Sequence, residues 1–351
     1  MKDKNEFLQI LRAVLFLMIF AYHCEIPGTS FLWAGVEIFF CISGFFIFNK
    51  IFEDIKSTEY LYKIIKNRIK RLWFYDYIII ITACLLSISI IYGKFDFLRF
   101  ISFLLFSQNI VWLFGGLNEY SILAHTWTIS IEVQTILGIG VLSILLHKLR
   151  ISKKVIIPLM FIISLVYILI FPYLLNSKLV FSLSPFSHFF AFAFGGLILL
   201  LKKRKYNLSK LGLLFLLVGG MGIGGITLFI SKIYNTGIIE AFLSMNSASV
   251  NILLGRPVAL IYAFISFIGA GLISLCISYT HNISNKIVNN LIIIGNNSFL
   301  LYLLHYPIVM FLSIIFMNKL AVFVLSLIFT FAFAKLLYQV GHFVAHKYPR
   351  A

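Results

Sequence analysis

The chain has 351 residues, of which 61% are hydrophobic and only 12% are charged. Soluble domains are about half apolar and roughly a quarter charged, so this composition excludes a purely soluble fold and predicts an integral membrane protein. The net charge of +17 would favour nucleic-acid binding in a soluble protein. Here the basic residues lie between apolar runs, which indicates membrane topology, and we expect no nucleic-acid partner.

Ten apolar runs approach the roughly 20 residues that a helix needs to cross a hydrocarbon core. They are residues 7–24, 31–50, 72–92, 124–146, 155–174, 184–201, 211–231, 251–277, 291–316 and 319–341. The pattern predicts an all-α integral membrane protein of about ten transmembrane helices. No stretch resembles a soluble second domain, so we expect one transmembrane domain over residues 1–351, without a cleavable signal peptide.

The lysines and arginines gather in alternate loops, chiefly at 50–71, 148–154 and 202–210. This asymmetry predicts that both termini face the cytoplasm. An eleventh apolar stretch, residues 97–114, is short and carries Arg99. If it crossed fully, the later basic loops would face outward. We therefore predict that 97–114 is re-entrant or lies at the membrane interface.

The four cysteines lie within or at the edges of apolar runs, and they form no CxxC pair. Their positions favour packing residues over a disulfide framework or a zinc site, and we expect no metal.

Arg12 and His23 lie eleven residues apart in the first predicted helix. At about 100° per residue they share nearly one face, about 16 Å apart along the axis. Ionisable side chains inside a membrane usually face a cavity or a partner. Imidazole exchanges protons near neutral pH, so His23 is a candidate general base. The alternative is an interfacial histidine whose hydrogen bonds are satisfied.

Two acidic residues lie within predicted helices. Glu37 is a candidate partner for a cation. Glu132 would lie about 12 Å below the outer boundary if its helix began near Ala124. His23 would lie in the same outer half of a core about 30 Å thick. We therefore predict that the Glu132 carboxylate hydrogen-bonds the His23 imidazole and fixes its tautomer.

Ser298, Tyr302 and His305 share one face of the ninth predicted helix, just before Pro307. They could add hydrogen-bond donors to the same cavity, although a simple helix–helix contact explains them equally well. Before the third predicted helix comes a basic run, Arg68-Ile69-Lys70-Arg71. Arginine forks suit phosphates, but basic residues also flank many cytoplasmic helix ends.

Five segments in order resemble the membrane acyltransferase-3 family, the O-acetyltransferases of bacterial surface polysaccharides. Arg12 and His23 are similar to its motif of arginine, ten residues and histidine. Arg68 and Arg71 are similar to its paired arginines before the third helix. Glu37 stands in a second-helix signature, Gly-Val-Glu-Ile-Phe-Phe-Cys-Ile-Ser-Gly-Phe, where aspartate is usual.

The other two segments are also similar to family signatures. Thr-Trp-Thr-Ile-Ser-Ile-Glu-Val-Gln at 126–134 resembles Thr-Trp-Ser-Leu-Ser-Val-Glu-Glu-Gln, with Val133 in place of the second glutamate. Ser-Phe-Leu-Leu-Tyr-Leu-Leu-His-Tyr-Pro at 298–307 resembles Ser-Tyr-Ser-Leu-Tyr-Leu-Trp-His-Trp-Pro. The family also implies ten helices with cytoplasmic termini. Many relatives add a periplasmic hydrolase-like domain, which we expect this chain to lack.

The resemblance implies an enzyme of the bacterial inner membrane that moves an acyl group, in this family typically acetyl, from acyl-CoA to a glycan hydroxyl. Its partners would be acetyl-CoA, a glycan or lipid-linked saccharide, and membrane lipid. The residues expected to act are His23, Glu132 and Arg12 in catalysis, Arg68, Arg71 and Lys70 on the coenzyme, and Glu37, Ser130, Trp127, Tyr302 and His305 around the cavity.

Two other functions fit part of the pattern. Charged groups inside a membrane also line transport paths, so a transporter or flippase of lipid-linked glycan is one alternative. Such proteins often contain inverted repeats with broken helices, and no such repeat is visible in this sequence. The other alternative is a non-catalytic component of a polysaccharide synthesis complex.

Overall fold

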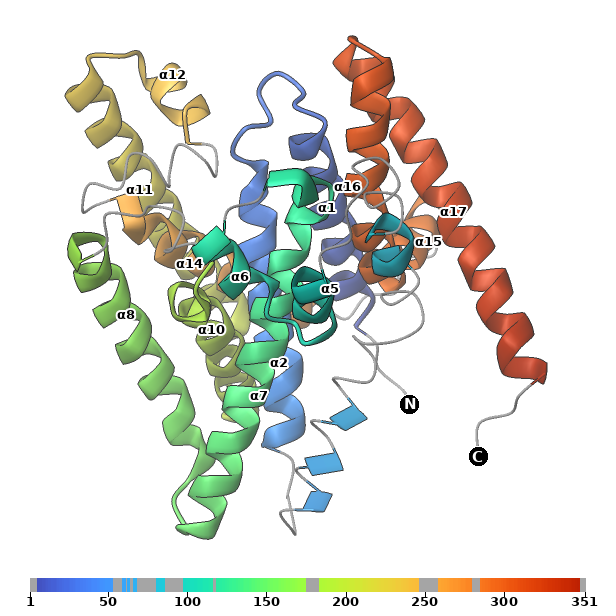
Figure 1. Cartoon of the computed structure of the whole chain (residues 1–351). Helices are drawn as coiled ribbons and strands as arrows, with labels where there is room; N and C mark the ends of the chain where they lie inside the picture. Colours follow the sequence, from blue (N-terminus) through green and yellow to red (C-terminus); the bar gives the residue numbers. More distant parts are fainter. Residues whose placement is uncertain are drawn as a thin grey trace.

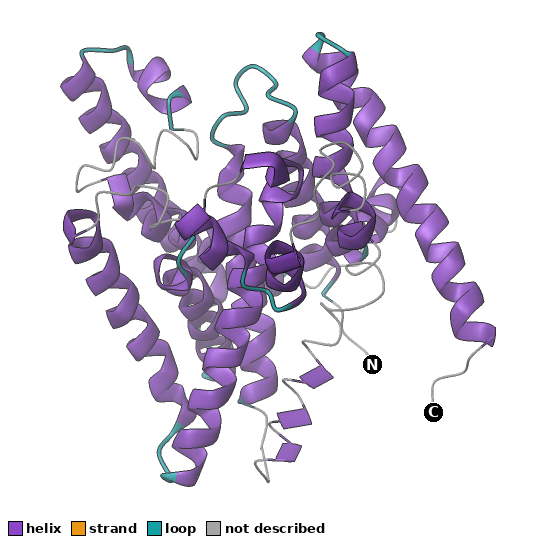
Figure 2. Cartoon of the chain, viewed as in Figure 1, coloured by secondary structure: helices purple, strands orange, loops and turns teal. Residues whose placement is uncertain are grey.

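The computed structural model describes residues 5–52, 59–60, 62–63, 66–67, 80–85, 97–115, 118–174, 183–245, 258–279 and 285–347. All regular secondary structure in these residues is helical (Figure 2). Within this part of the chain, nine helices are long and apolar enough to cross a membrane. The prediction of an all-α multi-pass membrane protein is confirmed. The remaining predicted span, 72–92, falls mostly outside the described residues.

The spanning helices are α1 (Glu6–His23), α2 (Gly35–Ile51), α7 (Trp127–Lys148), α8 (Ile156–Leu174), α10 (Pro185–Lys203), α11 (Leu208–Tyr234), α14 (Ile261–Ser278), α16 (Ser298–Ile315) and α17 (Lys319–Lys347). The shorter α-helices are α5 (Phe97–Leu104), α6 (Gln108–Gly115), α12 (Ile238–Leu243) and α15 (Lys286–Asn296). Short 3-10 segments cover Leu32–Ala34, Asn118–Thr126, Lys153–Val155 and Val258–Leu260.

Polar residues at the ends of the apolar runs set several helix boundaries. The Asn5 side chain accepts a hydrogen bond from the Leu8 amide at 3.2 Å and caps α1. Ser184 caps α10, and Pro185 occupies its first position, where no amide hydrogen is needed. Helix α11 ends at Asn235, whose φ of 51° is left-handed and suits asparagine. Local sequence therefore explains where these helices begin and end.

Close packing between α2 and α10 forms the centre of one half of the bundle. A Cβ on Gly44 would overlap the Phe192 backbone, and a Cβ on Gly195 would overlap the Cys41 backbone. Small residues allow such approach between membrane helices. Helices α8 and α14 also pack on α10, and α11 packs on α14. In Figure 1, α8 and α11 lie at the left of the molecule.

The other half is built from α1, α15, α16 and α17. Helix α1 packs on α15 and α16, and α16 packs on α17. Helices α16 and α17 lie at the right in Figure 1. A Cβ on Gly295 of α15 would overlap the Gln9 backbone of α1, so this contact also needs a glycine. Polar side chains from α1, α7 and α16 meet where the two halves join.

The prediction of one helix over residues 291–316 is wrong, because the chain breaks at Asn297. Residues before the break belong to α15 and residues after it to α16. Asn297 has φ −99° and ψ 6°, and its side-chain amide donates to the Ile293 carbonyl at 2.9 Å. An asparagine side chain that bonds the backbone competes with helix continuation. The break falls in the polar stretch 295–298, Gly-Asn-Asn-Ser, which the prediction of a single helix passed over because apolar residues lie on both sides of it.

Residues 97–114 form the short helices α5 and α6. Each has eight residues and spans about 12 Å, too little to cross a membrane. The Gln108 amide donates to the Thr126 carbonyl at 2.9 Å. The Asn109 amide donates to Gln134 on α7 at 3.1 Å. As predicted, the segment does not span. The buried amide donors of Gln108 and Asn109 bond to protein, whereas Gln108 Oε1 has no hydrogen-bond partner among the described residues.

The described turns named here lie at two ends of the molecule. In Figure 1 the turn between α7 and α8 lies at the bottom, and α17 also ends in the lower part of the view. The loop after α1 and the turn between α16 and α17 lie at the top. The basic residues of 148–154 thus share an end with the last turns of α17, as the predicted topology requires.

Candidate active site

Three imidazoles meet where the end of α1, the turn before α7 and the middle of α16 come together. The His23 ring centroid lies 5.2 Å from that of His305, and the His125 centroid lies 5.3 Å from it. Tyr306 packs against His23 at 4.6 Å and against His125 at 5.2 Å. Tyr302 packs on His125 at 5.3 Å. We call these five residues the histidine cluster.

Pro307 accounts for the position of His125. Proline has no amide hydrogen, so the carbonyl four residues earlier loses its helical hydrogen bond. In α16 that carbonyl belongs to Leu303, and the His125 Nε2 atom lies 3.3 Å from it. Because a carbonyl only accepts, we assign the Nε2–H as the donor. The proline therefore creates the acceptor that holds the His125 ring.

Two ring nitrogens of the cluster have no hydrogen-bond partner among the described residues. The His305 Nδ1 atom lies 2.5 Å from the Tyr302 carbonyl and is assigned as its donor, which leaves Nε2 as an acceptor. The assignment for His125 likewise leaves Nδ1 as an acceptor. Both nitrogens are buried and unpartnered. Buried polar atoms are normally hydrogen-bonded, so these two acceptors mark a place for a proton donor.

Tyr302 ties the cluster to the start of α7. Its hydroxyl donates to the His125 carbonyl at 2.7 Å and lies 2.9 Å from the Thr128 hydroxyl. Phe16 and Phe20 on α1 pack against His305 with centroid distances of 6.0 and 5.9 Å. The cluster is thus polar at its centre and apolar around it. Hydrogen bonds are stronger in such surroundings than in water.

The predicted contact between Glu132 and His23 is wrong. The Ser43 hydroxyl of α2 donates to Glu132 Oε1 at 2.5 Å. His23 faces two rings of α16 instead. Thr128 is the residue of α7 that contacts the cluster, and Glu132 lies more than one turn beyond it along the helix. The carboxylate therefore faces α2 at a different level.

A second polar contact joins α2 and α10. His188 Nδ1 lies 2.6 Å from Glu37 Oε2, and both side chains are 1% exposed. The Ser266 hydroxyl of α14 donates to Glu37 Oε1 at 3.3 Å. Trp127 packs on the His188 ring at 5.5 Å. We call the first two residues the Glu37–His188 pair. Sequence reasoning missed His188, although a histidine inside an apolar run is itself a signal of a buried polar contact.

The remaining predicted site residues lie apart from these contacts or outside the described residues. Arg12 is half-buried on α1, and its guanidinium donates to Gln9 Oε1 at 3.3 Å. Ser130 is fully buried, and its hydroxyl has no hydrogen-bond partner in the described part of the chain. The predicted coenzyme-binding residues Arg68, Lys70 and Arg71 lie outside the described residues.

Comparison with known families identifies the chain. The model of the acyltransferase-3 family, described as an acyltransferase domain, matches residues 5–339. That range includes the histidine cluster and the Glu37–His188 pair. Searches of curated proteins and of solved structures gave no match. The family match agrees with the resemblance seen in the five sequence segments. The chain therefore belongs to the acyltransferase-3 family, and it is a multi-pass membrane acyltransferase.

Proposed function

We propose that this protein is an O-acyltransferase of the bacterial inner membrane. It moves an acyl group, acetyl in the simplest case, from acyl-CoA to a hydroxyl of an exported polysaccharide or of its lipid-linked precursor. The observation that carries the proposal is the pair of buried acceptor nitrogens on His125 and His305. Neighbouring hydroxyls of one sugar are proton donors that would satisfy one acceptor each, and acylation of a hydroxyl needs a base that removes its proton.

The proposed reaction uses the three imidazoles in different ways. His125 and His305 are fully buried, whereas His23 is half-buried. We therefore assign His23 as the base, and the other two as acceptors for neighbouring hydroxyls of the same sugar, which would orient it. His23 removes the hydroxyl proton as the oxygen attacks the thioester carbon. The carbon–sulfur bond then breaks, and the coenzyme thiolate takes the proton from His23.

The donor is proposed to approach along α1. Arg68, Lys70 and Arg71 would bind the coenzyme phosphates, because basic side chains and above all guanidinium forks suit phosphate oxygens. Arg12 would lie along the path, about 16 Å from His23 on the helix axis. The flexible arm of the coenzyme would then carry the thioester toward the histidine cluster. Glu132 stays in the proposal as a positioning residue. Its carboxylate accepts the Ser43 hydroxyl and so links α7 to α2, and it does not contact His23.

The proposal predicts that the purified, reconstituted protein releases free thiol from acetyl-CoA when a surface glycan is supplied. Thiol release is followed with a thiol-reactive dye, and the acetyl mass on the glycan is measured by mass spectrometry. Glycan from cells that lack the gene should lose the same mass. If no acyl-CoA is consumed and labelled lipid-linked glycan instead crosses the vesicle membrane, the protein is a transporter and the proposal fails.

Replacing Pro307 by alanine should lower acyl transfer by about two- to tenfold without destabilising α16. The new amide hydrogen would bond the Leu303 carbonyl and displace the His125 ring. A typical hydrogen bond contributes about 0.5–1.5 kcal/mol, which sets this range. The measurements are kcat and the thermal midpoint in one membrane preparation. Unchanged kcat would contradict the role assigned to the carbonyl, and a lowered midpoint would contradict the expected relief of the helix.

A further inference from the structure

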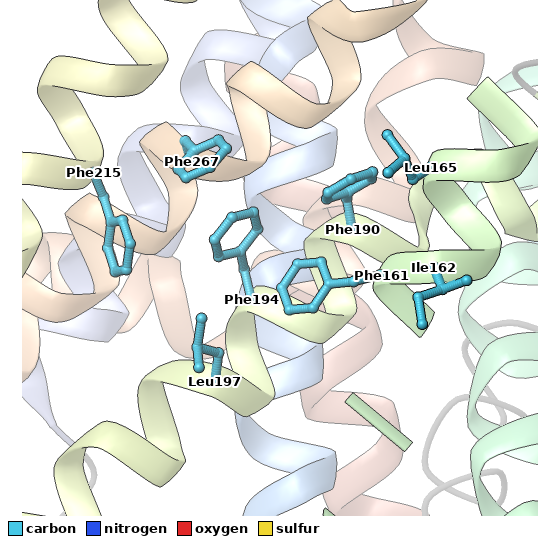
Figure 3. A pocket seen from close by; sticks show the side chains of 8 residues that line it. All are labelled: Phe161, Ile162, Leu165, Phe190, Phe194, Leu197, Phe215 and Phe267. Carbon is cyan, nitrogen blue, oxygen red and sulfur yellow. The ribbon is translucent and has the colours of Figure 1, made fainter. Parts of the chain in front are cut away.

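An apolar groove opens between α8 and α11, over a floor formed by α10 and α14 (Figure 3). Its volume is about 420 Å³. The residues that line it are Phe161, Ile162, Leu165, Phe190, Phe194, Leu197, Phe215 and Phe267. None belongs to the histidine cluster or to the Glu37–His188 pair, so the groove is a separate feature.

The floor of the groove is a packed set of aromatic rings. Phe194 is 4% exposed, and its centroid lies 4.5 Å from that of Phe267 and 4.9 Å from that of Phe161. Phe215 closes the α11 side at 5.8 Å from Phe194. Rings that pack on one another hold the shape of the groove before anything binds. A preformed apolar surface of this kind suits a hydrocarbon chain.

The rim of the groove is open on the outer face of α8. Leu165 is 42% exposed and Ile162 is 59% exposed, although both lie within a predicted membrane span. Apolar side chains exposed at this depth face lipid. The groove can therefore be entered sideways from the bilayer.

One end of the groove carries basic side chains on or next to three of the four helices that line it. Helices α8 and α10 run antiparallel, because a Cβ on Gly196 near the end of α10 would meet Ile157 at the start of α8. Lys154 precedes α8, Lys202 lies in the last turn of α10, and Lys210 lies in the first turn of α11. All three are exposed. We call them the basic cluster.

The distances along the helices match the dimensions of a lipid. Five residues separate Lys202 from Leu197 and Lys210 from Phe215, which corresponds to about 7.5 Å of helix. A phosphate on the basic cluster would thus lie one or two turns from the groove. From there a chain that fills half of a core about 30 Å thick would run along the aromatic floor.

The positive potential at this end comes from the lysine side chains and not from helix polarity. Helices α8 and α11 begin here, but α10 and α14 end here, because a Cβ on Gly212 near the start of α11 would meet Leu275 near the end of α14. The partial charges of the two helix starts and the two helix ends offset one another. An anionic headgroup would be attracted by the basic cluster, and a neutral headgroup would gain much less.

We propose that the groove binds one acyl chain of an anionic phospholipid whose phosphate lies on the basic cluster. The lipid comes from the leaflet that meets the basic loops. Charge complementarity at one end and an aromatic floor beyond it select this occupant over a zwitterionic lipid. The site goes beyond the proposed acyl transfer, and its test does not depend on that activity.

The test uses two tryptophan reporters at the same depth on α8. Leu165→Trp places the reporter on the groove, and Val166→Trp places it on the neighbouring face, where the native side chain is 49% exposed. Each protein is reconstituted in phosphatidylcholine containing a small fraction of brominated phosphatidylglycerol or brominated phosphatidylcholine. Bromine quenches tryptophan on contact. The unmodified protein, with its four native tryptophans, gives the background.

Brominated phosphatidylglycerol should quench the Leu165→Trp reporter several-fold more strongly than brominated phosphatidylcholine does. The Val166→Trp reporter should respond equally to both lipids. Equal quenching by the two lipids at Leu165→Trp would overturn the proposal, because the groove would then be ordinary lipid-facing surface. Absence of quenching by either lipid would also overturn it, because protein, such as a second copy of the chain, would then fill the groove.

A charge test separates the basic cluster from general attraction to the membrane. Changing the cluster to glutamine (Lys154→Gln, Lys202→Gln and Lys210→Gln together) should abolish the preference for brominated phosphatidylglycerol at the Leu165→Trp reporter. Changing the same three residues to arginine keeps the charge and should preserve the preference. A preference that survives in the glutamine variant would overturn the proposed role of these lysines.

Discussion

Acyl transfer should fall by about 10²–10⁴-fold when His23 is replaced by alanine, because positioned proton transfer contributes that much to enzymatic rates. His23 is the half-buried member of the histidine cluster, and its ring lies 5.2 Å from His305 and 4.6 Å from Tyr306. The rate is measured as glycan-dependent thiol release by reconstituted protein. If the His23→Ala variant transfers the acyl group at the wild-type rate, at equal protein level, His23 is not the base.

Alanine variants of two other histidines serve as comparisons for the loss of activity in His23→Ala. His147 is half-buried in the last turn of α7, at the opposite end of that helix from the cluster. His147→Ala removes an imidazole from the same membrane protein and should leave transfer within about twofold of wild type, since surface changes away from the site have small effects. His305→Ala removes an acceptor but leaves the proposed base, so its loss should be smaller than that of His23→Ala.

Replacing His188 by alanine should destabilise the fold by about 3–5 kcal/mol, which is typical when one member of a buried pair is removed. The bond between His188 and Glu37 measures 2.6 Å, and both residues are almost fully enclosed. Loss of the imidazole leaves a buried carboxyl without its nearest partner. The measurement is the free energy of unfolding from denaturant titration of purified protein.

A double-mutant cycle tests whether this cost belongs to the pair. The variant with both Glu37→Leu and His188→Leu removes both polar groups and should be more stable than either single variant. The exposed contact between Lys319 and Glu25 is the matched control, with a similar separation of 2.5 Å. Lys319→Ala should change stability by no more than about 1 kcal/mol. Additive effects of the two leucine changes would show that the pair is not coupled.

The Glu37–His188 pair is connected to the histidine cluster through the first turn of α7. Trp127 packs on the His188 ring, and the next residue of α7, Thr128, contacts the Tyr302 hydroxyl. A change at His188 therefore reaches the cluster through one turn of α7. Reduced activity in pair variants is accordingly expected as a secondary effect, through displacement of the turn that holds His125.

Much of the architecture follows from the sequence by itself. Apolar runs located most of the spanning helices, because about 20 consecutive apolar residues in helical conformation are what a hydrocarbon core accommodates. Basic loops at 148–154 and 202–210 showed that residues 97–114 do not cross, and the structure gives two short helices there. The resemblance in five segments indicated the family. The helix spans, the non-spanning segment and the family depend only on which residues follow one another along the chain, so the sequence is enough to predict them.

Only the tertiary structure decided which polar groups meet. Glu132 faces Ser43 rather than His23, and Glu37 lies against His188, which was not predicted. The Leu303 carbonyl, which loses its helical hydrogen bond because of Pro307, lies against His125. In a soluble helix the polar face points to water, so periodicity reveals orientation. In a membrane, apolar side chains pack equally well against lipid and against neighbouring helices. Hydrophobic periodicity therefore does not indicate which face of a spanning helix points into the bundle. The partners of a buried polar group are set by helix rotation and level, and packing across the whole bundle determines both.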